Sequence, residues 1–425
     1  MMNILEFPER ANWASIIKRP VADYISLNEK VSTVLNGVKL GGDKAVKQYT
    51  KEFDGVNLDH LLVTDAEMQE AQTLLSVELK IAIETAASNI RKFHLTQINK
   101  ERPVETMPGI TCWRKWVGID KVGLYIPGGS APLFSTILML GIPAEIARCK
   151  QVILCSPPDK TGKLHPAIIY AANLVGIKQL YKIGGVQAIA AMAYGTETVP
   201  AVYKIFGPGN QYVTAAKQMV QQHGVAIDMP AGPSEVCVLS DETAVPEFVA
   251  ADLLSQAEHG PDSQVLLVST SKQLIDKVNL ALTSQLSLLP RKELASKALQ
   301  NSRAVLMNSL SDAVDLVNEY AAEHLIIACN NANEIADQIS NAGSVFIGNY
   351  SPEAVGDYAS GTNHTLPTNA YARMYSGVSV DSFIKKITFQ QLTKEGLTAI
   401  ANTVETMAEA EGLKAHAEAV RVRLK

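Results

Sequence analysis

The sequence has few cysteines, and no two of them are spaced as CxxC, the arrangement typical of metal-binding and redox-active thiols. The five cysteines are an odd number at irregular spacings, which excludes the framework of a small disulfide-stabilised domain. We therefore predict free thiols in a reducing compartment, although a nucleophilic role for one of them stays open. The cysteines are Cys112, Cys149, Cys155, Cys237 and Cys329.

The sequence also lacks a strongly basic block and a secretion signal. Lys and Arg number 38 against 43 Asp and Glu, giving a net charge of −5, so a nucleic-acid partner is not expected. The first residues carry charges and a proline where a signal peptide needs an apolar core. Residues 122–144 are uncharged, but their three prolines and four glycines would leave backbone groups unpaired in lipid. We predict a cytoplasmic protein without a membrane segment.

Two long stretches alternate short apolar runs with helical patterns. Hydrophobic residues make up 47% of the 425 residues, enough for large cores and for two to four domains. Repeated strand, glycine turn and helix are typical of a doubly wound, mostly parallel sheet, so we predict an α/β fold. The predicted strands are 121–126, 151–155, 180–183 and 202–206 in the first stretch, and 235–240, 264–270, 304–307, 325–328 and 344–347 in the second.

The segments before and after these stretches have different patterns of polar and apolar residues. Residues 1–20 form a polar arm without a strong period, and residues 23–96 have a helical pattern that includes a capping box from Thr64 to Glu67. One long amphipathic helix is expected after Thr64, and core packing is a sufficient role for this region. The end of the chain has a β-like piece at 387–392, followed by alanine-rich charged helices. Such helices are typical of an arm that packs outside its own domain.

Three glycine turns follow predicted strands of the first stretch: PGGS at 127–130, IGGVQ at 183–187 and FGPGN at 206–210. Glycine turns at the carboxyl ends of parallel strands let the backbone approach phosphate groups. None is a GxGxxG motif, and a single such glycine is often only a residue with positive φ. Together the three turns favour a nucleotide site.

Titratable and amide side chains gather in the second stretch. A helix expected from Pro246 to about His259 places Asp252, Gln256 and His259 on one face, where an amide oxygen and an imidazole suit Zn²⁺ or Mn²⁺. The alternative is a helix end with a solvated His and Gln. Glu323 and His324 then form a pair at a predicted helix end, suited to two proton transfers or, alternatively, to a favourable helix dipole.

Seven segments together carry a resemblance to a known family. From about residue 20 to the end of the chain, in the same order and without large insertions, the sequence closely resembles histidinol dehydrogenase. The segments are VGLYIPGGSAPLFSTILML, IGGVQAIAAMAYGT, FGPGNQYVTAAK, DMPAGPSEV, LLSQAEHGPDSQ, EYAAEHL and GDYASGTNHTLPT.

The resemblance implies a fold of two incomplete Rossmann-like domains, an N-terminal arm and a helical C-terminal dimerisation tail. It implies an arm of 1–20, a first domain of 21–124 with 234–377, a second domain of 125–233, and a tail of 378–425 that crosses to the other subunit of a homodimer. It also implies site residues. The catalytic pair would be Glu323 and His324; the zinc ligands Gln256, His259, Asp357 and, from the other subunit, His416; the substrate contacts Ser234, His364 and Glu411 together with His324 and the zinc ligands; and the NAD contacts Tyr125, Gln187 and Asn210.

The implied reaction is the oxidation of L-histidinol, through histidinal, to L-histidine in two NAD-dependent steps. His324 would accept the hydroxyl proton in the first step, and Glu323 would activate the water needed in the second. Zinc would orient the amine and imidazole of the substrate. One alternative is a zinc hydrolase, which would produce no NADH and leave the glycine turns unexplained. Another is a non-enzymatic nucleotide-binding or assembly protein, which absence of bound metal would favour.

Overall fold

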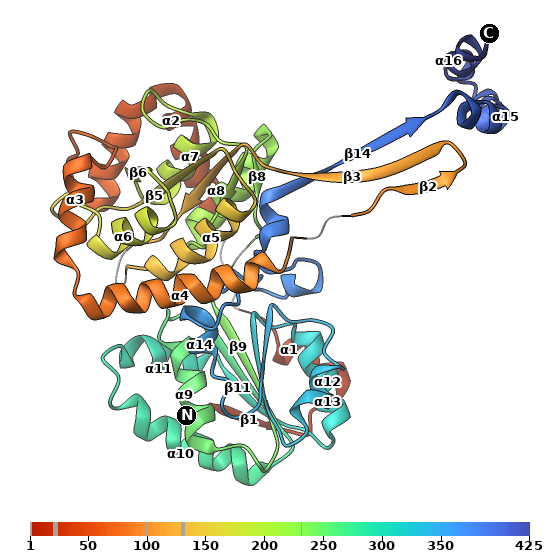
Figure 1. The fold of residues 1–425 in the computed structure, drawn as a ribbon. Coiled ribbons are helices and arrows are strands. Elements are labelled where there is room, and N and C mark those ends of the chain that lie inside the picture. Colours follow the sequence, from red (N-terminus) through yellow and green to blue (C-terminus); the bar gives the residue numbers. More distant parts are fainter. Residues whose placement is uncertain (1, 20–23, 99–100, 129–131, 231) are drawn as a thin grey trace.

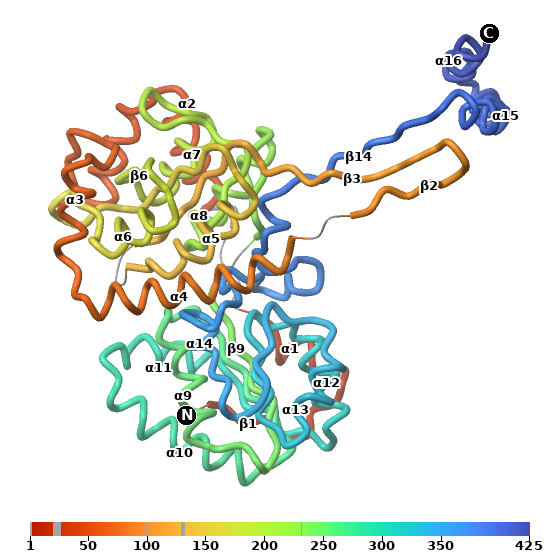
Figure 2. The backbone as a smooth tube through the Cα atoms, viewed as in Figure 1, coloured from red at the N-terminus to blue at the C-terminus, as the bar shows by residue number. Residues whose placement is uncertain are grey.

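The structure, a computed structural model, describes residues 2–19, 24–98, 101–128, 132–230 and 232–425. Two α/β lobes lie against each other, and a long arm projects away from them (Figure 1). Figure 2 shows that the arm combines two segments distant in the sequence, one orange and one blue, with the C-terminus at its far end. The predicted α/β class with parallel, Rossmann-like sheets is confirmed. Among the described residues, no helix is both long and apolar enough to cross a membrane.

The first lobe is built on a parallel sheet of six strands in the order β1-β11-β10-β9-β12-β13. Its central strands are buried along their whole length, as expected for apolar strands that are covered on both faces. Helices α9, α10 and α11 share a core with one face, and α1, α12 and α13 share a core with the other. The elements are β1 (Asn3–Glu6), η1 (Arg10–Asn12), α1 (Trp13–Ile16), β9 (Glu235–Ser240), α9 (Pro246–Ala257), β10 (Gln264–Ser269), α10 (Lys272–Leu286), α11 (Lys292–Gln300), β11 (Arg303–Leu306), α12 (Leu310–Tyr320), β12 (His324–Ala328), α13 (Ala332–Ala336) and β13 (Ser344–Ile347).

The second lobe is built on a parallel sheet of five strands in the order β6-β5-β4-β7-β8. Helices α4, α5 and α6 cover one face, and α2, α7 and α8 cover the other, each group sharing a buried apolar cluster with the sheet. The elements are α2 (Tyr24–Asp54, interrupted at Gly42), α3 (Asp65–Leu74), α4 (Val77–Leu95), β4 (Lys121–Tyr125), α5 (Phe134–Ile146), β5 (Gln151–Ser156), α6 (Pro166–Leu174), β6 (Gln179–Lys182), α7 (Gly185–Tyr194), β7 (Lys204–Phe206), α8 (Gln211–Val220), η2 (Gln221–His223) and β8 (Ala226–Ile227).

The helical segment α2–α4 corrects part of the predicted division. We assigned residues 21–124 to the domain of residues 234–377, but α2 and α4 share their buried clusters with the five-stranded sheet of the other lobe. The capping box at Thr64 is present, but the helix that it begins, α3, is short. Ser76 caps a second helix, α4, by accepting a hydrogen bond from the Leu79 N–H at 3.2 Å, so two helices stand where we predicted one long helix. The predicted N-terminal arm also contributes a strand, β1, which pairs in parallel with β11.

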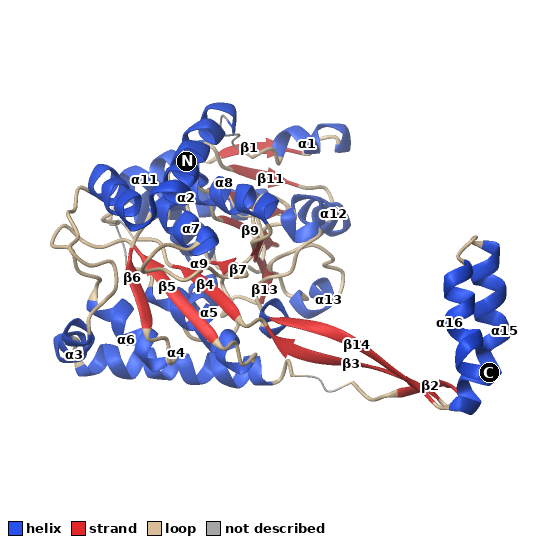
Figure 3. Cartoon of the chain, turned by 90° about the horizontal axis from the view of Figure 1, so that it is seen from above, coloured by secondary structure: helices blue, strands red, loops and turns tan. Residues whose placement is uncertain are grey.

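The arm is an antiparallel sheet of three strands that ends in two helices, as Figure 3 shows most clearly. Strand β3 pairs with β14 over the full length of both, from Gly118 opposite Ile384 to Ile110 opposite Leu392. The β-like piece predicted at 387–392 is therefore the outer part of a longer strand. The elements are β2 (Val104–Met107), β3 (Ile110–Gly118), β14 (Ile384–Leu392), α15 (Lys394–Ala410) and α16 (Lys414–Leu424); α14 (Glu353–Tyr358), η3 (Tyr371–Arg373) and η4 (Val380–Phe383) precede β14.

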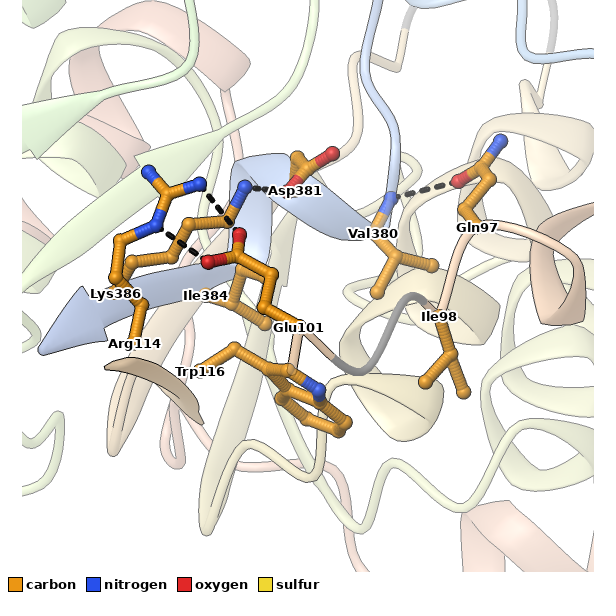
Figure 4. Close-up of a pocket in the computed structure, with 9 residues that line it drawn as sticks. All are labelled: Gln97, Ile98, Glu101, Arg114, Trp116, Val380, Asp381, Ile384 and Lys386. Atoms are coloured by element: carbon orange, nitrogen blue, oxygen red, sulfur yellow. Dashed lines mark hydrogen bonds and ion pairs between the residues drawn. The ribbon is translucent and has the colours of Figure 1, made fainter. Parts of the chain in front are cut away.

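Polar contacts hold the base of the arm, around a cavity of about 120 Å³ (Figure 4). Arg114 of β3 donates from its Nε and Nη2 to the two carboxylate oxygens of Glu101, in the segment that follows α4. The Gln97 side chain accepts a hydrogen bond from the Val380 N–H at 2.9 Å. These contacts tie the segment after α4 to β3 and to η4, which directly precedes β14, where the arm leaves the second lobe.

Candidate active site

The predicted catalytic pair lies at the amino end of β12. Helix α12 ends at Tyr320, so Glu323 directly precedes a strand and His324 begins it. The pair does not end a helix, and the helix-dipole alternative no longer applies. Both residues are buried, with 7% and 3% of their surface exposed. Strand β9 lies beside β12 and begins at Glu235, so the backbone of Glu235 faces both members of the pair.

The Glu235 backbone fixes the orientation of both side chains. Its N–H donates to the Glu323 carboxylate at 2.9 Å, and its carbonyl oxygen lies 3.2 Å from His324 Nδ1. A carbonyl can only accept, so this contact places a proton on Nδ1 and leaves Nε2 of a neutral ring as the base. Burial raises the pKa of Glu323 to about 8.

Helix α14 supplies two more carboxylates to the pair. His324 Nε2 and Asp357 Oδ1 lie 3.3 Å apart without the geometry of a hydrogen bond, and within the described chain both atoms are buried without a hydrogen-bond partner. Ligand atoms of His324, Glu353 and Asp357 all lie within 4.8 Å of one another. Burial alone would lower the pKa of His324, but the carboxylates of Glu323, Glu353 and Asp357 outweigh it and raise that pKa. Unpartnered ligand atoms and surplus negative charge fit a divalent cation.

The predicted metal ligands of the α9 segment lie beside this cluster. Gln256 is buried, and its amide sits between the Glu235 N–H and the Glu353 carboxylate. His259 follows the end of α9 and is exposed to solvent on one side; protein atoms around the ring partly desolvate it and lower its pKa. Ser234, a predicted substrate contact, directly precedes β9 and so adjoins the Glu235 backbone that holds the pair.

His364 joins the two lobes. Its Nδ1 lies 2.7 Å from the backbone oxygen of Asp357, and its Nε2 lies 3.0 Å from the Thr136 hydroxyl on the first turn of α5. Burial lowers the pKa of His364. Sequence reasoning missed Thr136, because a buried threonine in an apolar helix carries no local signal of a contact 228 residues away.

Glu411 and His416, the predicted contributions of the tail, are not brought to this site. Glu411 follows α15 and His416 lies on α16, at the far end of the arm in Figure 1. Both side chains are exposed. The structure thus brings Gln256, Glu323, His324, Asp357 and His364 together in one chain, places His259 and Ser234 next to residues of this group, and leaves Glu411 and His416 outside it.

The three predicted cofactor contacts line one cavity of about 1050 Å³ on the second lobe. Tyr125 ends β4, Gln187 is in the first turn of α7, and Asn210 caps α8 by accepting from the Tyr212 and Val213 N–H groups at 3.1 Å. Burial raises the pKa of Tyr125 to about 12, so its hydroxyl stays protonated, and it accepts from the Gly185 N–H at 3.1 Å. Sequence reasoning missed the α2 side of this cavity, formed by Lys30, Val31, Thr33, Val34, Tyr49, Glu52, Phe53 and Asp54, and also His165.

The turn between β7 and α8 is held against β4. Gly207 has a φ of +127°, and a Cβ atom there would collide with the Tyr125 carbonyl oxygen, so only glycine fits. Its N–H donates to Asp228 at 2.8 Å and its carbonyl accepts from Lys217 at 2.7 Å, while Lys217 and Asp228 form a buried ion pair. The predicted PGGS turn cannot be compared, because residues 129–131 lie outside the described residues.

Comparison with known proteins gives one consistent result. The family model described as histidinol dehydrogenase matches residues 17–424. The chain is 57% identical over 424 residues to histidinol dehydrogenase from Bacteroides thetaiotaomicron, covering 100% of this chain and 99% of that protein. It is 52% identical to the Vibrio cholerae protein of that name, over 97% of this chain and 96% of the relative.

Solved structures agree with the sequence comparisons. The crystal structure of histidinol dehydrogenase from Elizabethkingia anophelis has a TM-score of 0.97 at 56% identity, covering 100% of this chain and 98% of that one. An acetylating aldehyde dehydrogenase from Geobacillus thermoglucosidasius has a TM-score of 0.50 at 13% identity, over 91% of this chain and 95% of its own. The second likeness concerns the fold alone.

Proposed function

This chain belongs to the histidinol dehydrogenase family, and we propose that it oxidises L-histidinol to L-histidine in two NAD-dependent steps at a zinc site shared between two subunits. The observation that carries the proposal is the pairing of Glu323 and His324 on one backbone residue, next to an Asp357 oxygen that has no hydrogen-bond partner in the described part of the chain. Two bases with separate orientations suit two successive proton transfers. The cytoplasm, predicted from the cysteine pattern, stays our proposal for its location.

The chain's own residues fit a zinc ion. Gln256, His259 and Asp357, with His416 of the partner subunit, would hold it through the amide, imidazole and carboxylate donors that zinc accepts. When bound, zinc would fix the amine and imidazole of the substrate and, by its charge, oppose the carboxylates that raise the pKa of His324. The Asp357 oxygen without a hydrogen-bond partner among the described residues supports this role.

In the first oxidation, His324 accepts the hydroxyl proton of histidinol at Nε2. The carbon of the same group loses hydride to the oxidised nicotinamide cofactor, and histidinal and NADH form. The Nδ1 contact with the Glu235 carbonyl, at 3.2 Å, supports this assignment because it keeps Nε2 of the neutral ring free to take a proton.

In the second oxidation, water must add to the aldehyde before a hydride can leave the carbon. Glu323 takes a proton from that water as the water oxygen bonds to the aldehyde carbon, and the resulting hydrate anion then gives its hydride to a second NAD⁺ and becomes the carboxylic acid. A buried carboxylate with a pKa raised to about 8 is a stronger base than an ordinary glutamate. Ser234, His364 and the partner subunit's Glu411 would contact the substrate.

The cavity of the second lobe is the proposed NAD site. It has about 1050 Å³ of space and is lined by Tyr125, Gln187 and Asn210 at the carboxyl ends of three strands or the turns after them. The buried Gln187 Oε1 has no hydrogen-bond partner among the described residues, so it can accept from a donor of the cofactor. Thr136, at the start of the helix that follows β4, reaches His364 and connects the second lobe to the segment that carries His364.

The arm supports a homodimer in which tails are exchanged. Its strands and helices expose large apolar side chains, which a second copy would cover. A second set of exposed apolar residues lies beside the catalytic site on α9, α14 and the segment before it, where a partner's tail could dock. The first set is Ile387, Phe389, Leu392, Met407, Leu413 and Val422; the second is Phe248, Tyr350, Val355 and Tyr358.

The test of this function is a count of NADH formed for each histidinol consumed. Two oxidations give about two NADH, an ordinary alcohol dehydrogenase gives about one, and a hydrolase gives none. Mass spectrometry of the product should identify histidine. A ratio of one with histidinal as the product would contradict the two-step proposal.

A further inference from the structure

Glu353 is a buried carboxylate to which neither the family resemblance nor the mechanism above assigns a role. It begins α14 and exposes 1% of its surface. Its two oxygens face the side-chain amide of Gln256, one of them at 3.1 Å from the amide nitrogen and the other closer. A full negative charge at such depth is expensive unless it holds a specific partner.

The surroundings of Gln256 decide how its amide is turned. One side of the amide faces the Glu353 carboxylate, which accepts hydrogen bonds, and the other side faces the Glu235 N–H, which donates. Only one orientation satisfies both neighbours. The amide nitrogen donates to Glu353, and the amide oxygen accepts, at 3.3 Å, the longer branch of a shared hydrogen bond from the Glu235 N–H, whose nearer acceptor is Glu323 at 2.9 Å. An amide oxygen has two lone pairs, so one stays available for a metal ion.

Glu353 and Asp357 differ in the state of their oxygens, although both belong to the cluster around His324. Both Glu353 oxygens lie within hydrogen-bond distance of the Gln256 nitrogen. By contrast, the Asp357 Oδ1 is buried and has no hydrogen-bond partner among the described residues. This difference suits Asp357 to bind a cation directly and suits Glu353 to hold another ligand in place.

We propose that Glu353 is a positioning residue that turns the Gln256 amide oxygen toward the metal ion and is not itself a ligand. The inference rests on the proposed zinc site at Gln256, His259 and Asp357. Groups that orient a metal ligand contribute about 10- to 100-fold to metal affinity. Because Glu353 acts through Gln256, its contribution exists only while Gln256 is present.

The experiment is a double-mutant cycle on zinc affinity, measured by competition with a chelator on the dimeric protein. Gln256→Ala and Glu353→Ala should each weaken zinc binding by about 10- to 100-fold, and the double variant should be no weaker than Gln256→Ala alone. Glu353→Gln should recover most of the affinity, because its side-chain oxygen still accepts from the Gln256 nitrogen. The Co²⁺-substituted protein should keep its visible absorption spectrum in Glu353→Gln, since the ligand set is unchanged.

Asp252→Asn is the matched control, because Asp252 is a second carboxylate near Gln256, one turn before it on α9, and interacts electrostatically with Glu353 of α14. It should leave zinc affinity nearly unchanged; a loss equal to that of Glu353→Ala would mean that charge alone acts and would overturn the inference.

Additive losses in the double variant, or equal losses in Glu353→Gln and Glu353→Ala, would make Glu353 a ligand and also overturn the inference. If the wild-type protein binds no zinc, the proposed metal site fails together with the inference. Unchanged melting temperatures of the metal-free variants exclude misfolding as the cause.

Discussion

Two inactive variants should restore activity to each other if tails are exchanged between subunits. His259 follows α9 in the first lobe, whereas His416 lies on α16 at the end of the arm, away from the lobes of its own chain. If each active site takes His416 from the partner, His259→Ala damages the site on its own lobe, and His416→Ala damages the site on the other lobe. A heterodimer of the two variants then has one site with both lesions and one with neither.

The expected recovery follows from this arrangement. Equal amounts of the two chains that dissociate and reassemble at random give about half heterodimers, each with one intact site of its two, so about a quarter of wild-type activity should return. The assay is NADH production from histidinol after mixing, unfolding and refolding, with affinity tags of two kinds to measure the heterodimer fraction. Activity should rise in proportion to that fraction.

A mixture of His259→Ala and Gln256→Ala is the negative control. Both residues belong to the lobe, so every site of that heterodimer carries one lesion and the mixture should stay inactive. If the first mixture also stays inactive although tagged heterodimers form, each site takes His416 from its own chain, and the exchanged-arm model is refuted while the zinc site is not.

Three further predictions concern single sites. Glu323→Gln should leave histidinol oxidation largely intact and slow histidinal oxidation by ~10²–10⁴, the usual effect of losing a general base; equal loss in both half-reactions, assayed with histidinal supplied directly, contradicts the assignment. His259→Asn should lower zinc content and activity together and leave the circular dichroism spectrum unchanged, because the metal orients substrate and does not build a core; an unfolded variant would instead make the site structural. Gly207→Ala should cost about 1–3 kcal/mol of stability and raise KM for NAD, since its Cβ meets the Tyr125 carbonyl. Gly224→Ala, also at positive φ (+85°) but in open space, is its control and should leave KM unchanged.

Most of both sheets could be predicted from the sequence because their central strands are buried apolar runs. Strands β9 and β13 have the predicted bounds, Glu235–Ser240 and Ser344–Ile347. The apolar residues of β9 face helices on both sides, so this strand does not need the alternation of a half-exposed strand, and a short uninterrupted run is enough to identify it. Strand β13 lies at an edge of its sheet and is only partly buried, but it has a similar uninterrupted apolar run.

The arm could not be predicted in the same way. Strand β3 contains Trp113, Arg114, Lys115 and Trp116, a mixture without the period of a buried strand. Its partner β14 is more than 260 residues away in the sequence and is exposed along nearly all of its length, so both strands depend on pairing that no local pattern reveals. The packing of α2–α4 was mispredicted for a similar reason: an amphipathic helix shows that it has a buried face, but not which sheet covers it.

For the candidate site, residue types could be read from the sequence, but the contacts that orient them could not. The proton on His324 Nδ1 depends on the backbone carbonyl of Glu235, a contact independent of the side chain at that position. The Glu235 side chain has its own contacts, a bidentate ion pair with Arg19 at 2.7 and 2.9 Å and a hydrogen bond from the Asn369 N–H at 2.9 Å. One residue thus ties the catalytic pair to the N-terminal segment and to the loop after His364.

The proposed cofactor site and the catalytic pair lie at opposite kinds of strand end in the two sheets. The cofactor cavity lies at the carboxyl ends of the five-stranded sheet, whereas Glu323 and His324 lie at the amino end of a strand in the six-stranded sheet. Hydride transfer needs the cofactor and the substrate carbon in contact, so the lobes must keep a fixed relation across their junction. The hydrogen bond between Thr136 and His364 crosses that junction at 3.0 Å, and His364 also contacts the backbone of Asp357. A shift between the lobes would therefore disturb the proposed metal site and the cofactor side together, which makes the junction itself part of the catalytic geometry.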